Sequence, residues 1–455
     1  MAMQFELTRE FLEKLRIHID KKEEVAAFDM VKDLHPADIA EIYDELEIEE
    51  TKFLHDLLDD EKAADVFIEL EDDDRERFLD ALPSEEIAKQ LIDNLDSDDA
   101  ADIIGDLSEE KQEEVISYIQ DLEQAGDIVD LLNYDEDTAG GLMAKELITV
   151  NENWTMPTCL KEMRRQAAEV DEVYYVYVVD DNNVLKGTLS LKRMLLASTN
   201  ASIKSILNKD IISVKADTKS EEVANIMEKY DLVALPVVDA IGRLVGRITI
   251  DDVVDVMREE AERDYQLASG ITEDVEHTDN AWLLTRARIP WLFIGLFGGI
   301  IGALVIGNYE NDLGLYPQMA FFIPLIAAMG GNVGVQSSSI IVQALASNSL
   351  GFESIGKKLS KELLVASING IILSLVIFGY NSIFSDSFAL TITVSSALFA
   401  VIIFASLFGT FVPMLLNRFK IDPALATGPF ITTVNDIMGL FLYLMIGRVF
   451  FSIFI

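Results

Sequence analysis

One acidic residue stands deep inside an apolar segment of this 455-residue chain. The last apolar stretch covers residues 424–454, and Asp436 lies twelve residues into it. In a helix, that position is about 18 Å from the start, at about 1.5 Å per residue, and therefore near the middle of a hydrocarbon layer about 30 Å thick. A carboxylate there costs at least about 2.5 kcal/mol and is usually kept because it meets an ion, a proton or a substrate. The alternative is that polar groups of a neighbouring helix satisfy it.

A second apolar stretch, residues 316–345, carries polar residues at helical spacing. Asn332 and Gln336 are four residues apart, and Ser339 follows three further on, so all three share one helix face. Amides and hydroxyls on one stripe suit a hydrated cation path better than a lipid-facing surface. The glycines around them also allow close helix packing, which is the alternative role for this segment.

Carboxylates also repeat along residues 250–268, which read as one helix. Asp252 and Asp255, and likewise Glu260 and Asp264, are three or four residues apart. Like charges at that spacing destabilise a helix unless something neutralises them. A cation bound by this helix, or a simple solvated linker, would explain the pattern.

Five apolar stretches at the end of the chain are long enough to span a membrane: 289–307, 316–345, 363–383, 390–416 and 424–454. Lys and Arg residues mark the cytoplasmic side of such spans. They lie before the first span, between the second and third, and between the fourth and fifth: Arg286, Arg288, Lys357, Lys358, Lys361, Arg418 and Lys420. We therefore expect the N-terminal part in the cytoplasm and the C-terminus outside, in a multi-pass protein of the cytoplasmic membrane.

The net charge of −43 is concentrated at the front of the chain, where residues 1–140 hold 12 Lys and Arg against 46 Asp and Glu. Such a surface argues against binding nucleic acid or anionic lipid heads. Divalent hard cations would relieve its self-repulsion by bridging carboxylates, although a solvated face is the alternative. On charge density, the run that begins at Asp96 is a candidate for such a site.

Apolar residues in this acidic part recur at helical spacing, with Leu, Ala and Leu six residues apart. The pattern appears at Leu34, Ala40 and Leu46, again from Leu58 and from Leu95. In a further copy that begins at Leu82 and Ala88, Asn94 replaces the last apolar residue. Short paired helices that stack into a small solenoid fit this repeat best.

Residues 143–257 contain a second repeat, with an offset of 59 residues. Val178-Val179-Asp180 recurs as Val237-Val238-Asp239, and strand-like runs alternate with amphipathic helices. This looks like a tandem pair of CBS domains, a module that usually binds adenine nucleotides or ions. Thr249 and Asp252 match the family's ribose-binding pattern, whereas Ser190 and Arg193 depart from it in the first copy. A purely scaffolding pair is the alternative.

The whole chain resembles the MgtE family of magnesium channels and transporters. The most specific matches are Ala139 to Met143, Gly331 to Gln336, Asp422-Pro423-Ala424, and Asn435-Asp436. The resemblance implies a homodimer with a pore on its two-fold axis, lined by the second and fifth spans and holding Asp436 from both subunits. We expect the lining to include Asn332, Gln336, Gly428 and Asn435. It also implies that cytoplasmic Mg²⁺ binds Asp252, Asp255, Glu260 and Asp264, with Asp96 as the front-domain candidate, and closes the pore.

We therefore expect a multidomain membrane protein. Its parts are a superhelical all-α N-terminal domain (1–138), two α/β CBS domains (139–200 and 201–257), an acidic connecting helix (250–270) and an α-helical transmembrane domain with five spans (285–455). The expected function is Mg²⁺ uptake, gated shut by internal Mg²⁺, with ATP as a candidate ligand of the CBS pair.

Two other functions fit part of the sequence. A membrane-tethered cation or nucleotide sensor without transport leaves Asp436 without a purpose, and a CBS-regulated transporter of another substrate leaves the acidic front unexplained. We find no P-loop, nucleophile elbow or HExxH motif, so an enzyme is not expected.

Overall fold

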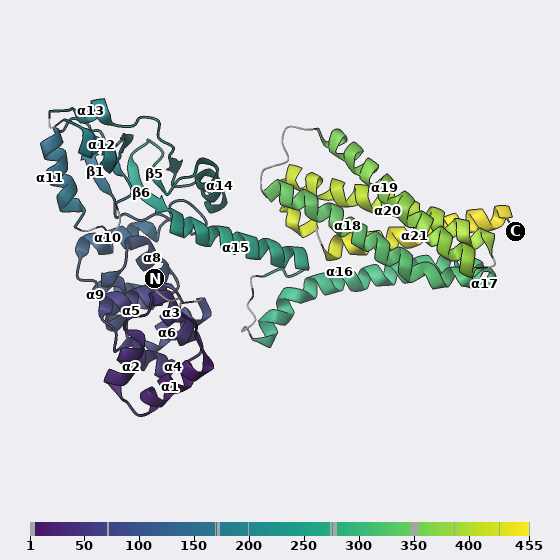
Figure 1. The fold of residues 1–455 in the computed structure, drawn as a ribbon, viewed down its shortest axis with the longest axis horizontal. Helices are drawn as coiled ribbons and strands as arrows, with labels where there is room; N and C mark the ends of the chain where they lie inside the picture. The colour runs from purple at the N-terminus through teal and green to yellow at the C-terminus, as the bar shows by residue number, and fades with distance from the viewer. Residues whose placement is uncertain are drawn as a thin grey trace. The chain divides into compact units, whose positions relative to one another are not determined.

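The computed structural model describes residues 5–70, 72–168, 170, 173–198, 200–273, 275, 280–346, 354–385, 387–426 and 428–454. The chain forms two compact units, Met1–Arg258 and Glu259–Ile455, and each is described by itself (Figure 1).

The first unit begins with short helices, as the repeat predicts. They are α1 (Arg9–Asp20), α2 (Glu24–Val31), α3 (Pro36–Asp44), α4 (Ile48–His55), α5 (Asp60–Ile68), α6 (Asp72–Ala81), α7 (Ser84–Glu86), η1 (Ile87–Leu91), η2 (Ile92–Asn94), α8 (Ser97–Gly105), α9 (Glu109–Tyr118) and α10 (Leu122–Leu131). The repeat alanines Ala40, Ala64 and Ala101 are buried where these helices pack. At the interruption, the Asn94 side chain is exposed and donates hydrogen bonds to the carbonyls of Lys89 and Gln90, which satisfies an irregular helix end.

Two small sheets with the same topology follow. The first contains β1 (Ile148–Asn151), β2 (Val176–Val179) and β3 (Leu185–Leu189), with helices α11 (Met156–Gln166), α12 (Leu191–Leu196) and α13 (Ile203–Ile206). The second contains β4 (Val214–Lys215), β5 (Ala234–Val238) and β6 (Leu244–Thr249), with helix α14 (Ser220–Tyr230). In each sheet the first two strands are parallel and the last two antiparallel. The register slips after Val178 in one and after Val237 in the other, which reproduces the 59-residue offset.

The segment before the first sheet is bound to the second. The Ala139, Gly140 and Ala144 amides donate to the carbonyls of Thr218, Ala216 and Arg247. A Cβ at Gly246 would lie 2.7 Å from the Met143 sulfur, so β6 needs glycine there. The Ala139 to Met143 motif therefore ties the two copies together.

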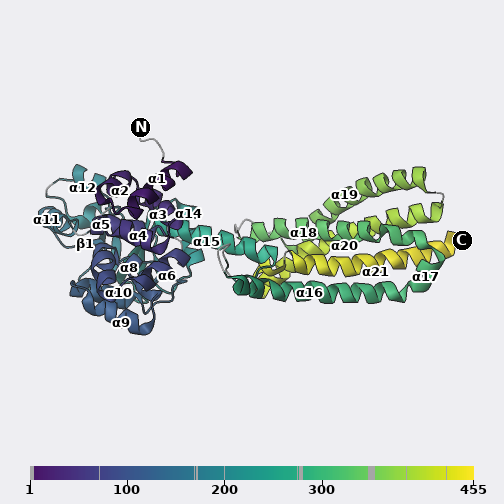
Figure 2. The same cartoon turned by 90° about the horizontal axis from the view of Figure 1, so that it is seen from below.

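One helix, α15 (Ile250–Ser269), continues from β6 as predicted. The second unit then contains α16 (Ala281–Asn308), α17 (Glu310–Leu315), η3 (Pro317–Phe322), α18 (Ile323–Ala346), α19 (Ile355–Phe384), α20 (Phe388–Arg418), η4 (Pro423–Ala426) and α21 (Pro429–Phe454). Five of these helical segments are long and apolar enough to cross a membrane. Figure 2 shows the five long helices running side by side, and α20 is the most buried of them.

Two spans begin earlier than hydropathy predicts. The helix α16 starts at Ala281 and not near Ile289, and α19 starts at Ile355 and not near Leu363. Hydropathy ends at the first charged residues, whereas backbone hydrogen bonding continues through them. The predicted fold class, with a helical front, two α/β units and five apolar helices, is confirmed, while the domain boundaries remain a prediction.

Candidate functional site

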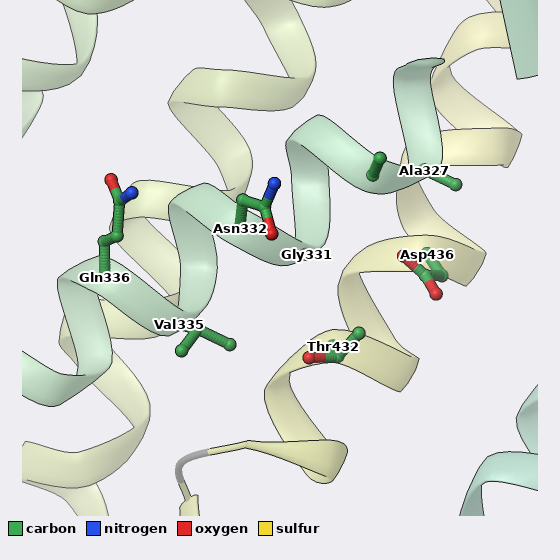
Figure 3. A pocket seen from close by; sticks show the side chains of 8 residues that line it. Ala327, Gly331, Asn332, Val335, Gln336, Thr432 and Asp436 are labelled. Carbon is green, nitrogen blue, oxygen red and sulfur yellow. The ribbon is translucent and has the colours of Figure 1, made fainter. Parts of the chain in front are cut away.

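A cavity of about 310 Å³ lies between α18 and α21 in the second unit. Its lining consists of Ala327, Ala328, Gly331, Asn332, Val335, Gln336, Thr432 and Asp436. Figure 3 shows Asn332 and Gln336 projecting from the same side of α18, with Thr432 and Asp436 on α21. Three of the predicted pore residues, Asn332, Gln336 and Asp436, are therefore brought together.

The Asp436 carboxylate lies beside the backbone of α18. A Cβ at Gly331 would be 3.6 Å from the Asp436 Oδ1 and 3.2 Å from the Thr432 methyl, so glycine allows α21 to approach. The Thr432 hydroxyl donates to the Gly428 carbonyl at 2.9 Å, which turns its methyl group toward Gly331. Among the residues that the structure describes, none donates a hydrogen bond to Asp436, so the alternative of a satisfied structural acid gains no support.

The cavity is large enough for a cation that keeps its water. Six inner-shell waters occupy about 180 Å³ at about 30 Å³ each, and Mg²⁺ gives up its waters reluctantly. Amide groups at Asn332 and Gln336 can donate to and accept from such waters, while the carboxylate supplies the charge.

Two predicted lining residues do not face this cavity. Asn435 is fully buried, and its amide fills the space beside Gly334, where a Cβ would overlap it. Successive helix residues are rotated by about 100°, so Asn435 faces α18 when Asp436 faces the cavity. Gly428 has a φ of 56° and lies against the Ala268 carbonyl, where any side chain would collide. In this chain, both residues shape helix contacts and do not line the cavity.

A crowded group of carboxylates lies in the first unit, where α8 meets the end of β6 and the start of α15. Carboxylate oxygens of Asp96, Asp98 and Glu146 all lie within 4.8 Å of one another. The Ser97 hydroxyl donates to Glu146 at 2.7 Å and accepts from the Lys145 amide at 2.9 Å, which holds Glu146 in place. We call Asp96, Asp98, Asp99, Asp102, Glu146 and Asp252 the acidic cluster.

Burial and mutual repulsion shape the proton affinities of this cluster. Burial, followed by the charges of Asp99, Asp252 and Asp96, raises the pKa of Asp98 well above its ordinary value. Burial, followed by Asp252, Asp102 and Asp96, raises the pKa of Asp99 to about 7. Burial also raises the pKa of Asp102 to about 7, although Arg75 opposes the rise. These carboxylates therefore hold protons that a divalent cation would displace.

An arginine side chain and a helix cap hold two of the carboxylates at the edge of the cluster. The buried Arg247 guanidinium lies 3.4 Å from the Asp96 carboxylate. The Thr249 amide and hydroxyl donate to the Asp252 Oδ2 at 3.0 and 2.8 Å. The predicted Asp96 and Asp252 thus lie in one cluster, and Asp252 also caps the start of α15.

The other predicted regulatory acids are elsewhere on α15. Asp255 is exposed, and Glu260 forms an ion pair with Arg263 at 3.5 Å. In the second unit, burial and then the nearby Asp422 carboxylate raise the pKa of Asp264. Asp264 and Asp422 therefore form a separate pair of like charges.

The nucleotide pattern is intact in the second copy only. Thr249 turns its hydroxyl to Asp252, as described above. In the first copy, the Ser190 hydroxyl accepts from the Arg193 amide at 3.3 Å, and the Arg193 side chain donates to the Ile206 carbonyl at 3.1 Å. Arg193 thus bonds to the chain where the pattern requires an acid.

Sequence reasoning named Asp98 and Asp99 only as part of an acidic run, and it missed Glu146 and Glu362. The first two stand in the acidic run that the charge count singled out, but spacing does not say which of its acids are buried. Glu146 is 49 residues from Ser97, its partner, and no local signal points to it. Glu362 lies one residue before the predicted third span, and its contacts are described below.

Comparison with known proteins follows the same division of the chain. The family models that match are "MgtE intracellular N domain" at residues 34–137, "CBS domain" at 139–200 and 203–259, and MgtE, "Divalent cation transporter", at 323–446.

Two curated relatives match most of the chain. The magnesium transporter MgtE of Thermus thermophilus is 36% identical over 321 residues, which are 69% of this chain and 70% of the relative. The magnesium transporter MgtE of Bacillus subtilis is 31% identical over 70% of each chain.

A solved structure matches the front of the chain. The cytosolic domain of the Mg²⁺ channel MgtE in complex with ATP is 34% identical, with a TM-score of 0.51, over 54% of this chain and 99% of that one. Together with the five apolar helices, these similarities indicate a multi-pass membrane protein with cytosolic domains. The chain therefore belongs to the MgtE family.

Proposed function

We propose that this protein is a Mg²⁺ channel or transporter that takes up Mg²⁺ as a homodimer, with Asp436 of both subunits on the ion path. The observation that carries the proposal is the Asp436 carboxylate in a cavity of about 310 Å³ lined by Asn332 and Gln336. The names of the relatives point to the same ion.

The ion passes with its inner waters. Each subunit offers the ion one carboxylate and two amides, and these groups attract a divalent cation through its water shell without replacing that shell. Weak binding of this kind allows the ion to leave again, which conduction requires. A negative interior favours entry by about 2.3 kcal/mol per charge for each 100 mV.

The basic residues support an orientation of the protein in the membrane. Lys357, Lys358, Arg418 and Lys420 lie in the two connections that we place in the cytoplasm. The first unit is then inside, the C-terminus is outside, and the membrane is the cytoplasmic one.

Gating follows from the acidic cluster and from the Asp264 and Asp422 pair. When internal Mg²⁺ is plentiful, it bridges these carboxylates and holds α8 against the start of α15. When internal Mg²⁺ is scarce, like charges repel, the contacts open and the pore is released. ATP is the second ligand in this proposal, and it binds the CBS pair beside Thr249 and Asp252.

Mg²⁺ flux into liposomes tests the ion path. Asp436→Asn keeps the shape of the side chain and removes its charge, so we expect a loss of at least about a hundredfold. Glu310→Gln is the matched control, because Glu310 is exposed and lies outside the cavity. Flux near wild type in the Asp436 variant, or an equal loss in the control, would overturn the assignment.

A further inference from the structure

A second carboxylate of the second unit is half-buried between three helices, outside the cavity. Glu362 stands on α19, seven residues after its start at Ile355, which is about 10 Å along the helix. Its Oε1 accepts a hydrogen bond from the Ser337 hydroxyl of α18 at 2.8 Å and another from the Ser406 hydroxyl of α20. The two hydroxyls are 3.0 Å apart. One oxygen atom therefore joins three helices.

Both serines are buried, with exposed fractions of 6% for Ser337 and 2% for Ser406. Hydrogen bonds to an ionised group are about twice as strong as neutral ones, and they strengthen further where water is excluded. Glu362 itself is half-buried and lies one residue before the predicted third span. Helix packing alone does not explain why its carboxylate meets two buried hydroxyls there.

The position of Ser337 supplies that explanation, because it follows Gln336 directly. The face of α18 around it consists of Gly330, Gly331 and Gly334, which bring no side chain of their own to the contact with α20 and α21. A Cβ at Gly409 would overlap the Gly334 carbonyl, so α18 and α20 are in backbone contact there. Successive residues of a helix are about 100° apart, so even a fraction of that rotation of α18 about its axis would turn Asn332 and Gln336 away from the cavity.

We propose that Glu362 is a positioning residue of the ion path: through Ser337 it fixes the rotation of α18, so that Asn332 and Gln336 face the cavity. Glu362 itself does not touch the ion. The inference rests on the proposed function for its importance to transport, but the geometry it describes can be measured without transport.

Thiol labelling tests the rotation. The chain has one cysteine, the buried Cys159, so a Cys159→Ala background leaves only introduced thiols. In that background, Gln336→Cys in the purified full-length protein is labelled with a charged methanethiosulfonate. Adding Glu362→Leu, which removes the acceptor but leaves the two serines able to bond each other, should slow labelling by at least about fivefold. Adding Ser337→Ala instead should have a similar effect.

Three further measurements complete the test. The combination Glu362→Leu with Ser337→Ala should slow labelling no more than either change alone, and Glu362→Gln, which retains an acceptor oxygen, should restore more than half of the rate. The control Glu310→Gln should leave the rate unchanged. A labelling rate within twofold of the parent in Glu362→Leu would overturn the proposal. So would a double variant in which the slowing by Glu362→Leu and the slowing by Ser337→Ala multiply.

Flux measurements separate this inference from the proposed function. If the parent protein conducts Mg²⁺, Glu362→Leu should raise the KM for Mg²⁺ at least about threefold, because the amides that meet the hydrated ion are displaced. A parent without flux would overturn the proposed function, whereas the labelling result would still decide the role of Glu362.

Discussion

The Asp436 cavity and the acidic cluster differ in the number of carboxylates that they bring together. In the second unit, a single half-buried carboxylate, Asp436, lies in a cavity with amides and small residues. In the first unit, six carboxylates crowd around α8 and the start of α15, and several hold raised pKa values. One carboxylate from each subunit suits an ion that must leave again. A crowd of carboxylates that repel one another suits an ion that stays and holds two parts together.

The largest expected difference concerns the length of the acidic side chain. Asp436→Glu keeps the charge but extends the carboxylate by one methylene into a cavity edged by Gly331, so we expect flux to fall by about tenfold or more. Asp99→Glu in the acidic cluster should change maximal flux less than twofold, since neighbouring carboxylates can adjust. Liposome flux at low internal Mg²⁺ measures both. An equal loss of flux in the two variants would contradict the distinction between a site that the ion passes through and a site that retains it.

Removing one charge from the acidic cluster should change the internal Mg²⁺ concentration that closes the pore and leave the maximal flux unchanged. We expect Asp99→Asn and Asp252→Asn each to raise the internal Mg²⁺ concentration for half-closure by about tenfold, because each removes a ligand charge. Glu228→Gln, on the exposed side of α14 and outside the acidic cluster, is the matched control and should leave that concentration unchanged. Flux titrated against Mg²⁺ on the cytoplasmic face gives the value, and a lower maximal flux in the Asp99 variant would contradict the assignment.

The raised pKa values give the cluster a pH dependence. Asp99 and Asp102 have a folded pKa of about 7 against an ordinary value of 3.8. The folded state therefore binds more protons than the unfolded state between about pH 4 and 7, so without divalent cations its stability falls as pH rises through that window. Mg²⁺ must displace these protons, and we expect its binding to weaken several-fold from pH 8 to pH 6.

Calorimetry in buffers of different ionisation enthalpy would report the protons released on Mg²⁺ binding. Asp99→Asn should reduce that release by about one proton per cluster at pH 6. A binding constant that does not change between pH 6 and pH 8 would show that the cluster is not where the cation binds.

A buried base gives the smallest expected effect and serves as a contrast to the buried acids. Burial lowers the pKa of His55 to about 4, and its ring packs edge-on against Phe78 at 4.8 Å. A lowered folded pKa means that the stabilising contribution is present above the ordinary value of 6.5 and is lost as pH falls toward 4. His55→Leu should reduce the fall in thermal stability between pH 7 and pH 5 without changing the response to Mg²⁺.

Sequence reasoning predicted three of the residues that line the cavity because its signals are local. An acid in an apolar run and polar residues four apart can be read without a structure, and Asp436, Asn332 and Gln336 do line one cavity. Adjacent residues on a helix face different ways, so Asn435, which was predicted together with Asp436, does not line this cavity. The repeat predicted the helices, and the 59-residue offset predicted the paired sheets, because both patterns arise from burial along the chain.

The remaining features depend on contacts between distant segments. Ser337, Glu362 and Ser406 meet across separations of 25 and 44 residues from Glu362, and nothing in their local sequence marks them as partners. The buried acids of α8 were predicted as a charged run and not as individual ligands, because exposure depends on what packs over them. Glu146 joins them only because the Ala139 to Met143 segment is bound to the second sheet.

The glycine contacts of α18 have a consequence for how this protein tolerates change. Gly334 adjoins the Asn435 amide, Gly409 meets the Gly334 carbonyl, and Gly331 borders Thr432. In a library that samples every substitution, these three uncharged positions should be as sparsely populated as Asp436 itself. A map of tolerated substitutions would then show a row of intolerant positions where the membrane helices are in backbone contact, and Asp436 would be one of those positions.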